Sequence, residues 1–262
     1  MKAFMDLIFT TDFFYSIFRV TTPLLFASMG AVISDVAGVP NIALEGMMLI
    51  AAFAGMFFSY FFESALMGLL FALLFAVLCA GVLAFFTLYY KTNIILGGIA
   101  INSLASGGTI FFLYLAAHDK GTSVSLPSKV LPNVNIPLIQ DIPVIGPAIS
   151  GHNVLTYLAV AAVIFTFFLL KRTSLGWHIR AVGEKREAAD SVGISVEKTQ
   201  AIALILSGLM CGFGGAFMSM GYVSWFSRDM VSGRGWIALA AEAMGLQHPL
   251  GTAATSLLFG VA

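Results

Sequence analysis

The chain has 262 residues, of which 59% are hydrophobic and only 10% are charged, against roughly 25% charged in an ordinary soluble domain. A soluble protein of this size is excluded, because its surface would need far more polar side chains than the chain supplies. The formal net charge is zero, which gives no indication of nucleic-acid binding. The composition therefore predicts an all-α, polytopic membrane protein forming a single transmembrane domain over residues 1–262.

Apolar stretches long enough to cross a bilayer recur along the chain, since a spanning helix needs about 20 apolar residues. Six such spans are expected. In chain order they are Phe13 to Ser34, Asn41 to Phe62, Leu66 to Tyr90, Ile94 to Ala117, Val154 to Leu170 and Thr199 to Gly221.

A seventh apolar segment begins near Trp236 and is interrupted at residues 245–249, which read Gly-Leu-Gln-His-Pro. Only thirteen residues, Leu250 to Ala262, follow this break, and they are too few to span the hydrocarbon. We therefore expect a broken or re-entrant helix here, in a sequence that is truncated at its C-terminus.

The basic residues indicate the orientation. The loop from Lys171 to Lys198 holds six of the thirteen Lys and Arg residues, which places it in the cytoplasm. Counting spans outward places the N-terminus and the segment His118 to His152 outside the cell. That outer segment contains five of the eight prolines and is predicted to be irregular. The chain is thus expected in the cytoplasmic membrane as a multi-pass protein.

Two acidic residues fall inside apolar segments, where an acid is costly to bury and by default lines a cavity or pairs with another group. Glu45 lies in NIALEGMML and Glu242 in WIALAAEAMG, and both stretches adjoin a Gly or Pro break. Broken helices at matching places in two halves are a pointer to a transporter's central site. Each acid either contacts the substrate or bonds a neighbouring backbone or Asn and fixes helix packing.

Polar and aromatic side chains extend this candidate site. Asn102 and Ser106 are four residues apart and share a helix face, which could bind a hydroxylated solute or a neighbouring helix. Trp225 and Phe226 belong either to an interfacial aromatic belt or to a surface that stacks on a nucleobase. The predicted substrate pathway comprises Asn41, Glu45, Asn102, Ser106, Trp225, Phe226 and Glu242.

The sixth span carries small residues four apart, at Gly208, Gly212 and Ala216. Such a row allows close helix packing or a gating hinge. The cytoplasmic loop is predicted to form a short helix from Glu184 to Val192, which Gly193 ends. Taken alone, this helix could be a solvated connector.

Enzymatic motifs are missing from the sequence. It contains no GxxxxGK[ST] phosphate loop, so the chain cannot hydrolyse ATP by that route. It has no HExxH, no GxSxG and no His pair at metal spacing. We expect no catalytic residue, no metal site and no cofactor.

The chain resembles the permease subunits of bacterial ABC importers for nucleosides, ribose-type sugars and branched-chain amino acids. The likeness rests on the run from Pro23 to Gly55, on GGIAIN, on SLGWHIRAVGE with EAADSVGI, and on the run from Gly221 to Gly245. LEGMML and SWFSRDMVSGRG are most similar to the guanosine/uridine-type nucleoside branch.

The resemblance implies three partners: cytoplasmic ATP-binding subunits, a second permease subunit expected to form a heterodimer, and an extracytoplasmic substrate-binding lipoprotein. It places the ATPase-coupling segment within residues 171–199, on Glu187, Ala188, Ala189 and Gly193. The chain departs from the family pattern in having no Leu-Pro after Ile202.

Other functions stay open at this point. The substrate could be a ribose-type sugar or a branched-chain amino acid. An ion-coupled secondary transporter would share the broken helices and buried acids, although it would not need the basic, glycine-ended loop. A membrane hydrolase would need a nucleophile and a base, and the sequence shows no such pattern.

Overall fold

The structure, a computed structural model, describes residues 11–119, 121–135 and 150–262. Within these residues six helical segments are long and apolar enough to cross a membrane, which confirms the six predicted spans. They are α2 (Thr11–Val36), α3 (Leu44–Phe61), α4 (Ala65–Ala84) with η1 (Phe85–Tyr89), α5 (Ile94–Ala117), α7 (Val154–Arg172), and α10 (Val196–Phe217) with η2 (Met218–Tyr222).

The second span begins later than predicted, at Leu44 instead of Asn41. Gly38 adopts a left-handed conformation with φ of 72°, which ends the preceding turn. The Asn41 side-chain oxygen then accepts the Ala43 N–H at 3.0 Å, ahead of the first helical turn. A short non-helical entry therefore precedes α3 inside the bundle.

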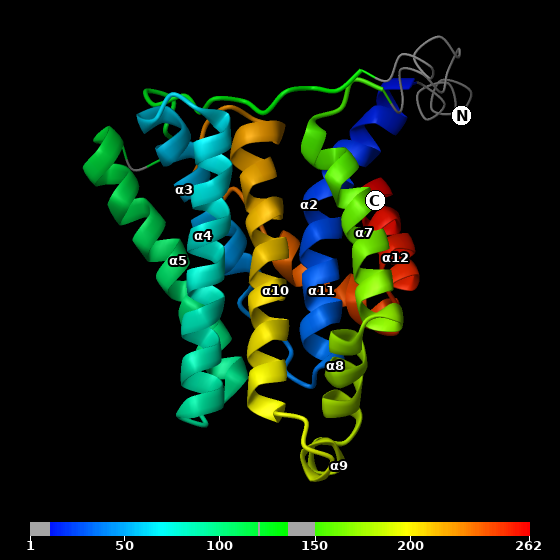
Figure 1. Cartoon of the computed structure of the whole chain (residues 1–262). Helices are drawn as coiled ribbons and strands as arrows, with labels where there is room; N and C mark the ends of the chain where they lie inside the picture. The colour runs from blue at the N-terminus through cyan, green and yellow to red at the C-terminus, as the bar shows by residue number, and fades with distance from the viewer. Residues whose placement is uncertain (1–10, 120, 136–149) are drawn as a thin grey trace.

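Helix α10 forms the centre of the bundle and packs against α2, α3 and α4 (Figure 1). A Cβ added at Gly208 would come within 2.5 Å of the Ala80 Cβ on α4, and one at Gly212 within 3.1 Å of the Leu73 Cα. The row of small residues thus allows the close packing that the sequence suggested. Helix α5 leans away from this core and is the least buried span (Figure 1).

Two short helices, α11 (Arg234–Met244) and α12 (Pro249–Val261), follow the sixth span and pack against α2. At 11 residues, α11 rises only about 16 Å, which is too short for a hydrocarbon core of about 30 Å. Leu246 and Gln247 between them take left-handed φ angles of 55° and 57°, and Pro249 opens α12. The predicted broken helix is confirmed.

The loop after α7 contains two helices, α8 (Ser174–Glu184) and α9 (Arg186–Ser191). The short helix predicted from Glu184 to Val192 is present as α9, but it begins two residues later, because Lys185 is extended (φ −153°, ψ 96°) and separates it from the unpredicted α8. Gly193 has φ of 84° and ends α9 as predicted, with the Ile194 N–H donating to the Ala189 carbonyl at 3.1 Å.

The described part of the proline-rich segment lies at the end of the bundle opposite to α8 and α9 (Figure 1). Its described residues after α5 contain no helix, as expected, and they bond to the chain after α10. Ser128 Oγ donates to the Ser219 carbonyl at 2.6 Å, and the Leu131 N–H donates to the Met220 carbonyl at 3.0 Å. Pro137, Pro143 and Pro147 lie outside the described residues.

Candidate functional site

Glu45 connects the start of α3 to the start of α11. Its Oε1 accepts the Gly233 N–H at 2.7 Å, and its Oε2 accepts the Gly235 N–H at 2.6 Å. The first N–H groups of a helix have no intrahelical partner, and the positive end of the helix dipole favours an anion there. The half-buried carboxylate therefore fixes where α11 begins.

Gly235 allows the two helix starts to meet. A Cβ on this residue would lie 2.5 Å from the Glu45 nitrogen and 2.7 Å from its Cα. These are backbone atoms of α3 and cannot rotate away. Only glycine fits at this contact.

Asn102 bonds the same turn of α3 from the side of α5. Its side-chain oxygen accepts the Gly46 N–H at 2.7 Å, and its amide group donates to the Ile42 carbonyl at 2.9 Å. Asn41 is fully buried and donates to Ser207 Oγ of α10 at 2.9 Å. The structure thus brings Asn41, Glu45 and Asn102 together around the entry to α3, where all three hold helices in place.

Glu242 lies about 10 Å further along α11, two helical turns from Gly235. It is only 5% exposed, and its Oε1 has no hydrogen-bond partner among the described residues. Its neighbour is Asp35 near the end of α2, whose Oδ2 accepts from the Gln247 amide at 2.6 Å. Glu242 therefore belongs to a second polar cluster. Sequence reasoning missed Asp35 and Gln247, although both adjoin the Gly and Pro breaks that it singled out.

The remaining pathway candidates differ in accessibility. Ser106 is exposed on α5, one turn beyond Asn102. Trp225 is 39% exposed, whereas Phe226 is fully buried with its ring edge-on to Phe53, the ring centroids 5.4 Å apart. Of these three, Ser106 and Trp225 are exposed enough to meet a solute, and Phe226 packs the core.

The predicted coupling segment on α9 has one exposed and one buried face. Glu187 and Ala188 are exposed, while Ala189 is 3% exposed and packs with Val182 of α8 and Val196 of α10. The buried face holds α9 against the bundle, and the face with Glu187 and Ala188 stays exposed.

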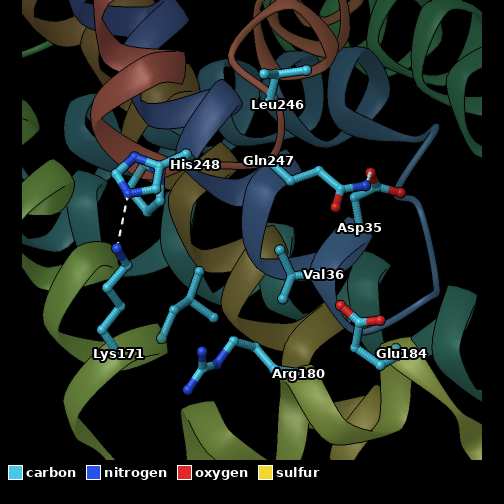
Figure 2. Close-up of a pocket in the computed structure, with 11 residues that line it drawn as sticks. Asp35, Val36, Lys171, Arg180, Glu184, Leu246, Gln247 and His248 are labelled. Carbon is cyan, nitrogen blue, oxygen red and sulfur yellow. Dashed lines mark hydrogen bonds between the residues drawn. The ribbon is translucent and has the colours of Figure 1, made fainter.

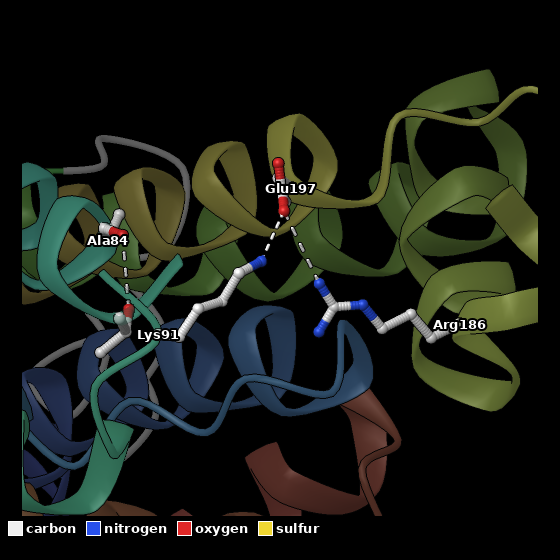
Figure 3. A network of polar contacts seen from close by, with 5 residues as sticks. Ala84, Lys91, Arg186 and Glu197 are labelled. Carbon is white, nitrogen blue, oxygen red and sulfur yellow. Dashed lines mark hydrogen bonds and ion pairs between the residues drawn. The ribbon is translucent and has the colours of Figure 1, made fainter. Parts of the chain in front are cut away.

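An ion pair joins the same region to the connection between α4 and α5. Glu197 Oε1 at the start of α10 lies 2.7 Å from Lys91 Nζ and 4.0 Å from Arg186 Nη2 of α9 (Figure 3). All three side chains are more than half exposed, so solvent screens the pairs. The two pairs add little stability, and their main effect is to link three chain segments at one end of the bundle.

Over residues 13–262 the chain matches a family described as the permease component of the branched-chain amino acid transport system. The chain belongs to this permease family. It is 36% identical over 92% of its length to the guanosine ABC transporter permease protein NupQ of Bacillus subtilis, of which it covers 77%. The nucleoside ABC transporter permease protein NupC of Lactococcus lactis is 32% identical, with 92% of this chain and 77% of NupC aligned.

A third relative is named for a different substrate. It is the putative glucose ABC transporter permease protein TsgC13 of Haloferax volcanii, 32% identical over 93% of this chain and 73% of its own length. No solved structure gives a significant match. Family membership and the six apolar helices make this permease a multi-pass protein of the cytoplasmic membrane, as predicted.

Proposed function

We propose that this permease is the membrane subunit of an ABC importer that carries nucleosides into the cell. The observation that carries the proposal is the 36% identity, over 92% of the chain, to a permease named for guanosine. A sugar is the second candidate, because TsgC13 is named for glucose.

The solute is proposed to pass the polar contact between α3, α5 and α11. Glu45 and the first N–H groups of α11 provide an acceptor and donors close together, inside an apolar bundle. The vicinal hydroxyls of a ribose both donate and accept, so they suit such a pair. Ser106 is exposed on the adjoining helix and offers a further hydroxyl.

ATP hydrolysis is assigned to separate cytoplasmic subunits, since the chain has no phosphate-binding loop. The exposed face of α9, with Glu187 and Ala188, is proposed to dock into them. Movement of α9 would reach the pore through Ala189, which contacts both α8 and α10. An extracytoplasmic lipoprotein delivers the solute at the opposite end, and a second, different permease completes the pore.

Competition for uptake tests the substrate. The complex is reconstituted with its ATPase, second permease and binding protein, and ATP-dependent uptake of labelled guanosine is measured. Excess unlabelled guanosine or uridine is expected to suppress uptake, and excess ribose or leucine to leave it unchanged. If labelled guanosine is not taken up, uptake of labelled ribose would instead favour the sugar, and uptake of labelled leucine the amino acid.

A further inference from the structure

A cavity of about 400 Å³ lies where α2, α7 and α8 end near the turn between α11 and α12 (Figure 2). It is separate from the contact between Glu45 and α11 and from the exposed face of α9. Its polar lining consists of Asp35, Lys171, Arg180, Glu184, Gln247 and His248.

The charges around this cavity are separated by sign. On one side Lys171 Nζ lies 3.0 Å from His248 Nε2, and on the other Gln247 donates to Asp35 at 2.6 Å (Figure 2). Arg180 and Glu184 are one turn apart on α8, a spacing that favours an ion pair. Figure 2 shows instead that they diverge, with Arg180 toward the lysine side and Glu184 toward the aspartate side.

Neither of the two ion pairs found among the described residues involves a charge of this cavity. Two cationic and two anionic groups therefore face one space without neutralising each other. A ligand that carries both charges, one at each end, would satisfy both sides at once.

The cavity lies at the ends of two spanning helices, where lipid headgroups are expected. Lys171 is in the last turn of the spanning helix α7, and Asp35 is next to the last residue of α2. Leu246 on the adjoining turn and Leu250 at the start of α12 are 84% and 53% exposed, so an apolar surface borders the charged one. Basic pockets at the cytoplasmic ends of membrane helices are suited to lipid headgroups.

We propose that this cavity binds the headgroup of a phosphatidylethanolamine from the cytoplasmic leaflet. The phosphate accepts hydrogen bonds from Lys171 and Arg180, and the ammonium donates to Asp35 and Glu184. Phosphatidylcholine cannot make the second set of bonds, because its trimethylated nitrogen has no N–H. Phosphatidylglycerol has no cation for the acidic side.

Retention of lipid by the purified protein tests the site. The full chain, with any partners that stay attached, is incubated in detergent with equal amounts of the three lipids, and bound lipid is counted by native mass spectrometry. Phosphatidylethanolamine is expected to bind roughly tenfold more tightly than phosphatidylcholine, the effect of losing one or more charge-assisted hydrogen bonds.

Two variants separate the two sides of the cavity. Glu184→Gln is expected to remove most of the preference for phosphatidylethanolamine over phosphatidylcholine. Arg180→Gln is expected to weaken the binding of all three lipids. Both residues are exposed on α8, and thermal unfolding checks that each variant keeps its fold. Lys198→Gln, an exposed lysine outside the cavity, is the matched control and should bind like the unchanged protein.

Equal retention of phosphatidylethanolamine and phosphatidylcholine by the unchanged protein would overturn the proposal. So would lipid binding that neither variant alters. Binding of soluble phosphoethanolamine in the absence of any retained lipid would assign the cavity to a free solute and equally contradict it.

Discussion

The carboxylate of Glu45 accepts two backbone N–H groups that belong to residues 188 and 190 positions further along the chain. One side chain thereby joins the start of α3 to a short helix that does not span the bilayer. If the solute passes here, this contact must open or exchange its partners. Replacing Glu45 is consequently the most informative change at the residue scale.

Glu45→Gln leaves one oxygen to accept an N–H and turns an NH2 group toward the other, so one hydrogen bond is lost. The expected result is a loss of about 1.5–3 kcal/mol from the α3–α11 contact, the range for a hydrogen bond to a charged group. Guanosine uptake by the reconstituted complex should fall roughly tenfold or more, with normal membrane insertion. Glu63→Gln, at the exposed end of α3, serves as the control and should transport normally.

Gly235→Ala places a Cβ 2.5 Å from the Glu45 nitrogen, so the start of α11 has to move. We expect transport to be lost while the protein still assembles, because the clash is confined to this contact. Gly107→Ala on α5 adds the same methyl group where nothing lies within 4 Å. Equal uptake by the two variants would show that the position of α11 does not matter for transport.

That the Glu45 carboxylate has partners could be predicted from the sequence, because an acid in an apolar segment needs a partner. The identity of the partners of Glu45 could not be predicted. Gly233 and Gly235 offer only backbone N–H groups, which carry no side-chain signal, and the contact depends on how distant helices pack. The Gly or Pro breaks beside Glu45 and Glu242 suggested one candidate site, whereas the structure places Glu242 beside Asp35.

At the scale of elements, α9 allows a paired test of coupling. Ala188 is exposed and Ala189 is buried against Val182 and Val196, although the two are chain neighbours. Ala188→Trp should block docking of the ATPase, so that ATP hydrolysis no longer drives uptake while the permease stays folded. Ala189→Trp should instead displace α9 and lower the melting temperature.

Both activities and the melting temperature are measured for each variant. Normal coupling in Ala188→Trp would mean that α9 is only a connector. Gly193→Val adds a third test, since a left-handed φ costs a non-glycine residue about 1–2 kcal/mol and more for a β-branched one. It should loosen the end of α9 and weaken coupling.

The packing of α10 on α4 gives a second prediction for an element. Gly208→Val would force a side chain into the space of the Ala80 Cβ and the Ala76 carbonyl. Overpacking of this kind costs about 1–3 kcal/mol, so the melting temperature in detergent should fall. Gly81→Ala on α4 meets no atom within 4 Å and should melt like the unchanged protein. If both variants melt alike, the row of small residues is not a packing surface.

Long apolar helices could be predicted from the sequence, whereas short helices with few apolar residues could not. The six spans follow from hydropathy alone, because a bilayer leaves an apolar run of that length few alternatives. Helix α8 was missed because it is short and exposed, with only Gly176, Ile179 and Val182 buried. Its one sequence signal was Thr173, whose hydroxyl accepts the Gly176 N–H at 3.0 Å as an N-cap.

At the scale of the whole molecule, the basic residues near α8 and α9 predict that this end of the bundle faces the cytoplasm. The proline-rich end is then predicted to face the outside of the cell. Ser125→Cys in the proline-rich segment should react with an impermeant thiol reagent added to intact cells. Lys198→Cys should react only after the membrane is opened. Both positions are exposed, and the native Cys211 is buried. The reverse pattern would invert the proposed roles of the two ends.

Measuring which energy source drives uptake is the most direct test of the central claim. That claim is that separate ATPases drive a permease that has no phosphate-binding loop. Guanosine accumulation is measured in vesicles that contain the assembled complex. Accumulation is expected to require internal ATP, to stop with vanadate and to persist when an uncoupler removes the ion gradients. Accumulation without ATP that the uncoupler abolishes would contradict this claim and identify an ion-coupled transporter.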